Sequence, residues 1–408
     1  MSSPVSFARH EKLRTDRAIS SAYAELRTRP LAMAAFAQLL AIVRERSSLL
    51  DASKLRGLVR PQIDALRNLA RFAQSFLRPP DAWQPLGDSR FTILDSLAQH
   101  LLARYPVPRF MASVWCGGAD AYSDTKRVWF VAHASGQSFR SLALPMVMTR
   151  RMEGLFLRSP DHFDIEPAMR QAELRALGAS RALVDAVLAT PVGSDLRNGC
   201  FWRSVWLLLV RESDALDLNS VGPIIDFLDA IRHRQTMVEQ DGRTTRVPPA
   251  EPHFSLAGRT LRSLMRRVEV WHGRLAASGG AASSWAPSRY TGWRVREASP
   301  PEDADRAATV WEFVELTNSE ELREEGWRLR HCVASYATAC VRGRSRIWSL
   351  RRGREPRPER SVLTIEVDPG TRFVVQARGF ANARASGRPR RLLEQWARRE
   401  GLAVSKTV

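Results

Sequence analysis

The stretch RHCVASYATACVRG, residues 330–343, holds a histidine, two cysteines and a tyrosine in a chain that has only four cysteines. These residue types can serve as metal ligands, nucleophiles or general bases. On a helix, Cys332 and Cys340 would stand two turns apart, roughly 12 Å, which is too far to share one zinc ion. No CxxC or HxxxH pair completes a tetrahedral set. The sequence therefore predicts no metal site and no cofactor, and it favours cysteines that are packed as small apolar residues.

His331 is the residue of this stretch most suited to chemistry. A break is expected after EEGWRLR, residues 324–330, so His331 is predicted to stand at a helix start. A helix N-terminus presents free backbone N–H donors to a nearby anion. Two interpretations stay open: a buried, hydrogen-bonded structural histidine, or a member of an anion-binding or catalytic site.

Further polar residues come from two predicted strands, 361–367 and 372–378. Their alternation places Leu363, Ile365 and Val367 on one face of the first strand, and Phe373, Val375 and Ala377 on one face of the second. Burying both sets on one side requires a loop of odd length, such as residues 368–372. The opposite face then carries Thr364, Glu366, Gln376 and Arg378 side by side.

An imidazole, a carboxylate and a guanidinium around one cleft can perform acid/base chemistry on a phosphate or acyl centre. His331, Glu366 and Arg378 are the candidate catalytic residues, with Arg378 binding an oxyanion. The same groups would equally suit a buried network that attaches the sheet to its helix, because buried polar groups must find partners. Gly379 is predicted to be a turn residue with positive φ.

Two arginine clusters are candidates for phosphate contact. The run RRGREPRPER, residues 351–360, is predicted to be an exposed hairpin loop that contributes Arg351, Arg352, Arg354, Arg357 and Arg360. The second cluster, at near-helical spacing, contains Arg259, Arg262, Arg266 and Arg267. Leu261, Leu264, Met265 and Val268 predict a core helix with a basic outer side. The alternative for both clusters is a solvated surface whose charge only aids solubility.

The elements that would position these residues predict an α+β fold. Residues 1–272 read as a predominantly α-helical region, residues 273–289 as a linker or surface loop, and residues 290–408 as a module with an antiparallel sheet and packed helices. The module's predicted strands are 308–317, 345–350, 361–367 and 372–378, and its predicted helices are 318–342, broken near Gly326, and 389–401.

The composition suits a cytoplasmic protein with reduced thiols and no membrane segment, because no apolar run is long enough to span a bilayer. The 408 residues carry a formal net charge of +19, which favours a polyanionic partner such as DNA or RNA. A codon bias toward arginine would explain why lysine is rare, but it does not explain the surplus of positive charge. A basic protein that binds another protein stays possible.

The order and spacing of these residues resemble the PcfJ-like family. The residues that carry the resemblance are Leu322, Glu325, Gly326, His331, Cys332, Val333, Tyr336, Gly343, Glu366, Gln376, Arg378, Gly379, Asn382 and Trp396. The resemblance covers about residues 311–400 and implies a bacterial protein associated with plasmids and other mobile elements, without an established reaction. It also groups Cys332, Tyr336, Gln376 and Asn382 with His331 as a ligand-binding or polar cluster.

Three functions follow as hypotheses. The first is a nucleic-acid-associated protein of mobile-element or plasmid type that binds DNA or RNA largely through arginine–phosphate contacts. The second is an enzyme acting on nucleic acid or a nucleotide with His331, Glu366 and Arg378, although no P-loop, GxGxxG or HExxH motif is present. The third is a protein-interaction scaffold in a transfer or defence complex.

Overall fold

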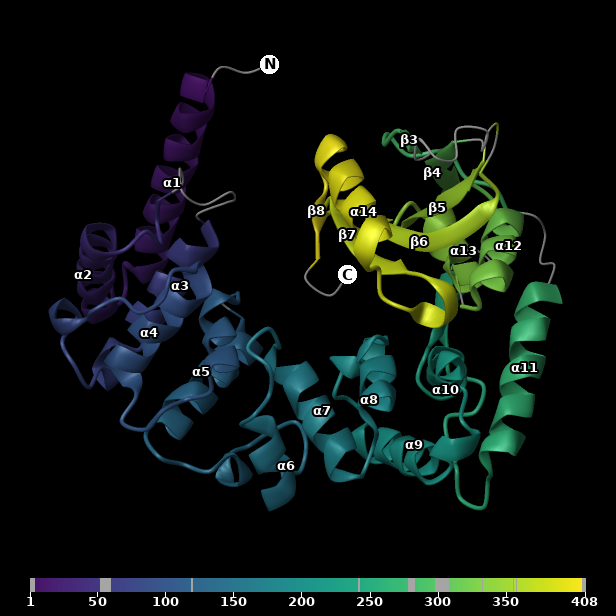
Figure 1. Cartoon of the computed structure of the whole chain (residues 1–408), viewed down its shortest axis with the longest axis horizontal. Helices are drawn as coiled ribbons and strands as arrows, with labels where there is room; N and C mark the ends of the chain where they lie inside the picture. Colours follow the sequence, from purple (N-terminus) through teal and green to yellow (C-terminus); the bar gives the residue numbers. More distant parts are fainter. Residues whose placement is uncertain are drawn as a thin grey trace, which may run out of the picture. The chain divides into compact units, whose positions relative to one another are not determined.

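The computed structural model describes residues 4–51, 60–118, 120–240, 243–277, 283–297, 308–331, 333–354, 356 and 358–405. The chain forms two compact units, Met1–Ala176 and Leu177–Val408 (Figure 1). None of the helices in these ranges combines the length and the apolar character needed to cross a membrane.

The first unit is helical. Its helices are α1 (Pro4–Leu26), α2 (Pro30–Arg46), α3 (Arg60–Ala70), α4 (Arg90–Leu102), α5 (Ala121–Ala134), α6 (Arg150–Phe156) and α7 (Ile165–Ala176), joined in part by the 3₁₀ turns η1 (Ala73–Ser75), η2 (Pro80–Ala82), η3 (Arg109–Cys116) and η4 (Phe139–Ser141). Ser89, Asp120 and Thr149 cap α4, α5 and α6, because each side-chain oxygen accepts a backbone N–H of the first turn. Phe110, Trp115 and Phe130 are fully buried in its core.

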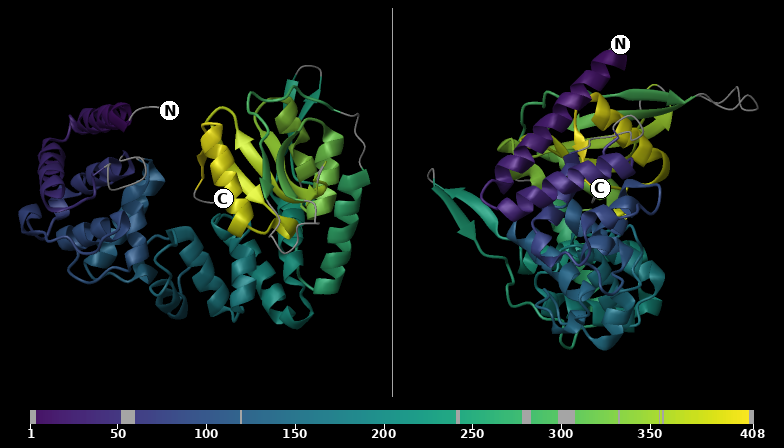
Figure 2. Two further views of the ribbon diagram at one scale, coloured as in Figure 1. Left: turned by 45° about the horizontal axis from the view of Figure 1, so that its top comes forward. Right: turned by 90° about the vertical axis from the view of Figure 1, so that its left-hand side faces the viewer.

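The second unit begins with helices as well. They are α8 (Arg181–Leu188), α9 (Gly199–Arg211), α10 (Val221–Arg232) and α11 (Leu261–Ala277), with the 3₁₀ turns η5 (Pro191–Gly193), η6 (Ser213–Ala215) and η7 (Leu218–Ser220). Between α10 and α11, β1 (Thr236–Gln240) and β2 (Arg243–Val247) form an antiparallel two-stranded ribbon, visible in teal in Figure 2. The helical periodicity of residues 1–272 did not predict this ribbon.

A six-stranded sheet completes the second unit and confirms the predicted α+β class. Its strands, in both chain and spatial order, are β3 (Arg294–Glu297), β4 (Thr309–Leu316), β5 (Arg346–Arg354), β6 (Arg360–Asp368), β7 (Phe373–Arg378) and β8 (Ala403–Val404). Neighbouring strands are antiparallel except for the parallel pair of β7 and β8. The helical elements around it are α12 (Ser319–Leu329), η9 (Val333–Tyr336), α13 (Ala337–Val341), η10 (Phe380–Asn382) and α14 (Gly387–Arg399).

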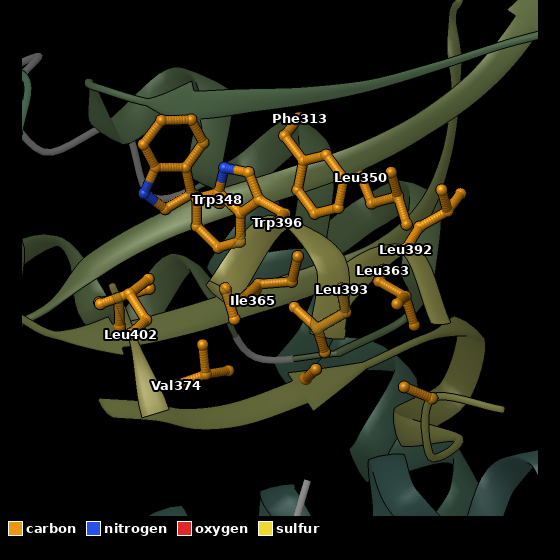
Figure 3. Packing of buried hydrophobic residues seen from close by; sticks show 14 of the residues in the cluster. Phe313, Trp348, Leu350, Leu363, Ile365, Val374, Leu392, Leu393, Trp396 and Leu402 are labelled. Atoms are coloured by element: carbon orange, nitrogen blue, oxygen red, sulfur yellow. The ribbon is translucent and has the colours of Figure 1, made fainter. Parts of the chain in front are cut away.

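The two faces of this sheet differ in character. One face packs against α14, where Trp396 lies among Phe313, Trp348, Leu363 and Ile365 (Figure 3). The other face packs against α12 and α13 through a smaller apolar cluster. This cluster consists of Trp285, Leu316, Leu322, Val333, Cys340 and Ile347. The second face also carries the polar residues Thr364, Glu366 and Arg378, and α12 lies over it (Figure 1). The site residues therefore lie on the side of the sheet opposite the large core.

The segment predicted as a linker, residues 273–289, has several environments. Residues 273–277 belong to α11, residues 278–282 lie outside the described residues, and Trp285 is buried with its indole N–H donating to the Leu316 carbonyl at 3.1 Å. The division between a helical region and an α+β module inside the second unit stays a prediction.

The strand register agrees with the prediction over half of the hairpin. Thr364 pairs with Arg378 and Glu366 pairs with Gln376, so these four residues share a face as expected. Nearer the turn the prediction for Phe373 and Val375 is wrong. The register shifts after Glu366, so that Val374 is buried and Phe373 is exposed. A bulge that inserts Val375 reverses the alternation, because two residues of β7 then oppose one step of β6.

A second bulge allows a buried carboxylate to bind β6. Leu350 pairs with Leu363 and Arg351 pairs with Ser361, which leaves Val362 without a partner. The hydroxyls of Ser361 and Thr364, three positions apart, therefore reach the same carboxylate, that of Glu325 on α12, at 2.7 and 2.9 Å. Burial raises the pKa of Glu325, and these hydrogen bonds oppose the rise.

Candidate functional site

A cavity of about 70 Å³ lies on the polar face of the sheet. Six of the residues singled out from the sequence line it: His331, Tyr336, Glu366, Gln376, Arg378 and Asn382. Its remaining lining residues are Pro191, Asp226, Arg234, Val333, Ile347 and Thr364. We call this space the polar cavity. Cys332, the seventh residue of the predicted cluster, lies outside the described residues.

His331 reaches the polar cavity from the turn after α12. Arg330 takes a left-handed conformation with φ of 51°, and the His331 N–H donates to the Gly326 carbonyl at 3.1 Å. A Cβ at position 326 would lie 2.8 Å from the His331 carbonyl oxygen, so only glycine permits this close turn. The break expected after Arg330 is confirmed, and His331 lies in this break, two residues before η9, which leads directly into α13. The helix breaks at residues 330–331 and not at Gly326.

The imidazole of His331 is neutral and has one free nitrogen. The residue is 6% exposed, and its Nε2 has no hydrogen-bond partner among the described residues. Burial lowers the pKa of His331 to about 4, with a smaller contribution from repulsion by His272. At neutral pH the ring can accept a proton or donate a hydrogen bond, depending on its tautomer.

Arg378 is a buried cation without an ion-pair partner among the described residues. It is 7% exposed, its Nη1 donates to the Ala377 carbonyl at 3.2 Å, and its Nε has no partner. Burial lowers the pKa of Arg378 to about 10, and repulsion from Arg384 lowers it further. Asp226 and Tyr336 act in the opposite direction. The guanidinium is therefore still charged at neutral pH.

Glu366 and Tyr336 form the side of the polar cavity nearest α13. The Ser345 hydroxyl donates to Glu366 Oε1 at 2.6 Å, and the Tyr336 hydroxyl donates to Gln376 Oε1 at 3.3 Å. Burial raises the pKa of Glu366, while hydrogen bonds from Ser345 and Tyr336 act against this. A carboxyl group with a raised pKa that lines the same cavity as a neutral imidazole is a pattern found at acid/base sites.

Asn382 connects the cavity wall formed by the turn η10 with α10 through a hydrogen bond. Its Nδ2 donates to Asp226 Oδ2 at 2.8 Å, and both groups are buried. A Cβ at Gly222 would lie 2.7 Å from the Ala381 carbonyl oxygen, so the helix approaches this turn through a glycine. The left-handed residues here are Ala381 and Asn382, with φ of 52° and 64°. Gly379 directly precedes the turn η10, as expected, but its φ of −93° is not positive.

The comparisons with known proteins identify this part of the chain. Residues 304–390 match the family model of PcfJ-like proteins. The chain thus contains a PcfJ-like domain. No curated protein and no solved structure matches the chain. All six predicted residues of the polar cavity fall inside the PcfJ-like domain, whereas Asp226 and Arg234 come from outside it.

Sequence reasoning missed Asp226, Arg234 and Ser345. Asp226 precedes Asn382 by 156 positions, and no local pattern marks it, because an aspartate in an amphipathic helix ordinarily faces solvent. Ser345 stands one residue before β5 and could have been found only from the strand pairing. Among the described residues, no three His, Cys, Asp or Glu side chains are placed to hold a metal ion together.

A larger groove of about 790 Å³ adjoins the PcfJ-like domain at α12. We call it the aromatic groove. Trp327 on α12 is 74% exposed and lines it, together with the exposed Phe380. Its other lining residues are Asp217, Asn219, Ser220, Pro223, Met265, Val268, Glu269, His272, Gly273, Arg323, Gly326, Arg328, Arg330, His331 and Ala334. His331 lines both the groove and the polar cavity, so it lies between the two spaces.

The arginines predicted for phosphate contact have different environments. The prediction of a loop over residues 351–360 is wrong in extent, because Arg351, Arg352 and Arg354 belong to β5 and Arg360 begins β6. Successive strand residues point to opposite faces, which separates them. Arg351 is half-buried and acts electrostatically on Glu325, whereas Arg352 is exposed and lies 5.2 Å from the centre of the Trp311 ring.

Of the arginines predicted for phosphate contact, five are exposed: Arg352, Arg354 and Arg360 on the strands, and Arg262 and Arg266 on α11. Arg259 lies before α11, half-buried, and its Nε donates to the Ser255 carbonyl. Arg357 lies outside the described residues. The role of all these arginines in phosphate contact stays a prediction.

Proposed function

We propose that this protein is a nucleic-acid-associated protein of plasmid or mobile-element type, which binds DNA or RNA largely through arginine–phosphate contacts. The net charge of +19 supports a polyanionic partner. The observation that carries the proposal is the exposed Trp327 in the aromatic groove, since the groove combines aromatic rings with arginines. This combination favours a single strand, whose unpaired bases can stack.

The walls of the aromatic groove differ in charge. Arg323 and Arg328 belong to α12, and Arg330 follows it with its guanidinium 5.4 Å from the centre of the Phe380 ring. The acidic lining residues, Asp217 and Glu269, belong to the segment before η7 and to α11. We therefore expect the phosphates of a bound strand to lie along α12, where a base can stack on the exposed ring of Trp327.

The outer side of α14 adds a second basic surface to the same unit. Arg391, Arg398 and Arg399 are exposed, while Leu392, Leu393 and Trp396 bury the opposite side of the helix. Sequence-independent binding needs only such cations at the surface, and each phosphate contact makes the affinity fall with salt.

Trp327→Ala tests the proposal by fluorescence polarisation with labelled single-stranded DNA and RNA. We expect the Kd to rise roughly 5- to 100-fold, since stacking on one aromatic ring contributes about 1–3 kcal/mol per base. Phe373→Ala is the matched control, because Phe373 is an exposed aromatic residue of β7, in the same unit as Trp327, and it does not line the groove. Equal loss in both variants, or affinity that does not depend on salt, would contradict the proposal. Absence of binding at low salt, with recovery of a fixed protein partner, would favour the scaffold function.

A second candidate is an enzyme acting on nucleic acid or a nucleotide, because the neutral His331 shares the polar cavity with Glu366 and Arg378. His331→Gln should then lower product formation at least about 100-fold, as the loss of a general acid or base does. Nucleic-acid affinity should stay unchanged. Undiminished turnover in this variant would exclude the mechanism. The control is Gln137→Glu, a substitution in the first unit at a residue that does not line the polar cavity, which should leave product formation unchanged.

A further inference from the structure

We propose that the polar cavity is a binding site for one tetrahedral oxyanion of the sulfate or phosphate class, held chiefly by the guanidinium of Arg378. The proposal concerns a ligand and not a reaction, so it goes beyond the proposed function. It rests on the unmet hydrogen-bonding and charge requirements of the residues that line this space.

The first observation is the state of Arg378. A buried cation without a paired anion is costly, and such groups are normally paired with a carboxylate or a ligand. Its Nε is buried and has no partner in the part of the chain that the structure describes, although two acidic residues line the same cavity. An oxyanion can accept two parallel N–H donors from a guanidinium, which is the geometry that favours arginine at phosphate sites.

The second observation is that other donors converge on the same space. The His331 Nε2 is buried and has no partner among the described residues, and the cavity is also lined by the side-chain amide of Gln376. Arg234, which follows α10 and is 3.3 Å from Asp229, adds a second positive charge to the lining. These groups surround a small ligand on several sides.

Size and charge decide between an anion and water. A volume of about 70 Å³ has room for a small polyatomic ion or for a few water molecules. Water could satisfy the two free nitrogens, but it does not neutralise the charge of Arg378. An oxyanion does both.

The acidic residues of the lining set the pH dependence. Asp226 of α10 accepts a hydrogen bond from Asn382, and Glu366 of β6 has a pKa raised by burial. The other charged or titratable groups facing the space are Arg378, Arg234, Tyr336 and His331, and the pKa of His331 is about 4. Because its pKa is raised, Glu366 takes up a proton at a higher pH than an ordinary carboxyl group, and this protonation removes a negative charge from the lining. Anion affinity should therefore rise toward low pH.

The oxyanion has two possible sources. His331 lines both the polar cavity and the aromatic groove, so a phosphate of a strand bound in the groove lies next to this site. A free anion or a terminal phosphate would present the same chemistry. Comparison of inorganic sulfate, a 5′-phosphorylated dinucleotide and the unphosphorylated dinucleotide distinguishes these sources.

The test is sulfate binding to the full chain, measured by calorimetry and by the melting temperature at constant ionic strength with chloride. Sulfate does not titrate between pH 5.5 and 8. We expect saturable binding that Arg378→Gln weakens roughly 10- to 100-fold, the effect of losing a charge-assisted hydrogen bond. Arg391→Gln, which removes one exposed arginine of α14, should leave the affinity unchanged. Circular dichroism checks that each variant is folded, and Arg378→Lys, which keeps the charge, should retain part of the affinity.

Glu366→Gln is expected to raise the affinity for sulfate, whereas Arg378→Gln lowers it. At high pH, where Glu366 carries its charge, this variant should bind sulfate severalfold more tightly than the wild type, and its affinity should depend less on pH. Equal sulfate effects in the wild type and in Arg378→Gln would show that the cavity holds water only and would overturn the proposal. Sulfate binding is measured without nucleic acid or turnover, so failure here is distinguishable from failure of the proposed function.

Discussion

Trp396→Ala is expected to destabilise the second unit by about 3–5 kcal/mol, the range for removing a large aromatic side chain from a core. Trp396 is 0% exposed, and its ring is stacked on Phe313 with 4.9 Å between ring centres. The ring of Trp348 lies beside it (Figure 3), with 5.0 Å between ring centres. The indole N–H of Trp396 donates to the Thr291 carbonyl at 2.9 Å. The substitution removes these contacts together and leaves a cavity between α14 and the sheet.

Urea denaturation of the full chain measures this effect, and Trp327→Ala is the matched control. Trp327 lies in the same unit but is 74% exposed, so its removal should change the free energy of unfolding by no more than about 0.5 kcal/mol. Similar losses of stability in the two variants would contradict the packing described for α14. Trp327→Ala would then also be unsuitable as a probe of binding.

Acidification is expected to remove up to about 3 kcal/mol of stability through His331 alone. The pKa of His331 is about 4 in the folded protein against an ordinary value of 6.5, because the ring is buried. Above pH 6.5 neither state is protonated and the contribution is complete. Between pH 6.5 and 4 only the unfolded chain binds the proton, so stability falls as the pH falls.

The difference between the wild type and His331→Gln isolates this effect. Glu325 and Glu366 have raised pKa values, so acidification relieves their burial cost and acts in the opposite direction. Their contributions cancel when the two proteins are compared at each pH by urea denaturation. We expect the stability difference between them to change by about 3 kcal/mol from pH 7 to pH 4. A constant difference over this range would show that His331 is accessible to protons in the folded state.

Local alternation was sufficient to predict much of the candidate site. Glu366, Gln376 and Arg378 share a face because side chains on paired strands follow a period of two, which is visible in the sequence. The same reasoning was wrong for Phe373, because a bulge changes the period at a point that no residue type marks. It was also wrong for the arginines of β5, since arginine and proline suggested a loop where strand pairing with β4 continues to Arg354.

The sequence by itself determined the α+β class, the PcfJ-like resemblance and the set of polar residues that meet in one place, because helix and strand periods and motif spacing are local properties of the chain. Tertiary structure alone decided that Asp226 joins Asn382 from 156 positions away, and that Arg378 is buried without an ion-pair partner among the described residues. Burial and pairing depend on which distant segments pack together. That choice is made by the whole fold, and it sets the charge and the free hydrogen-bonding groups of the polar cavity.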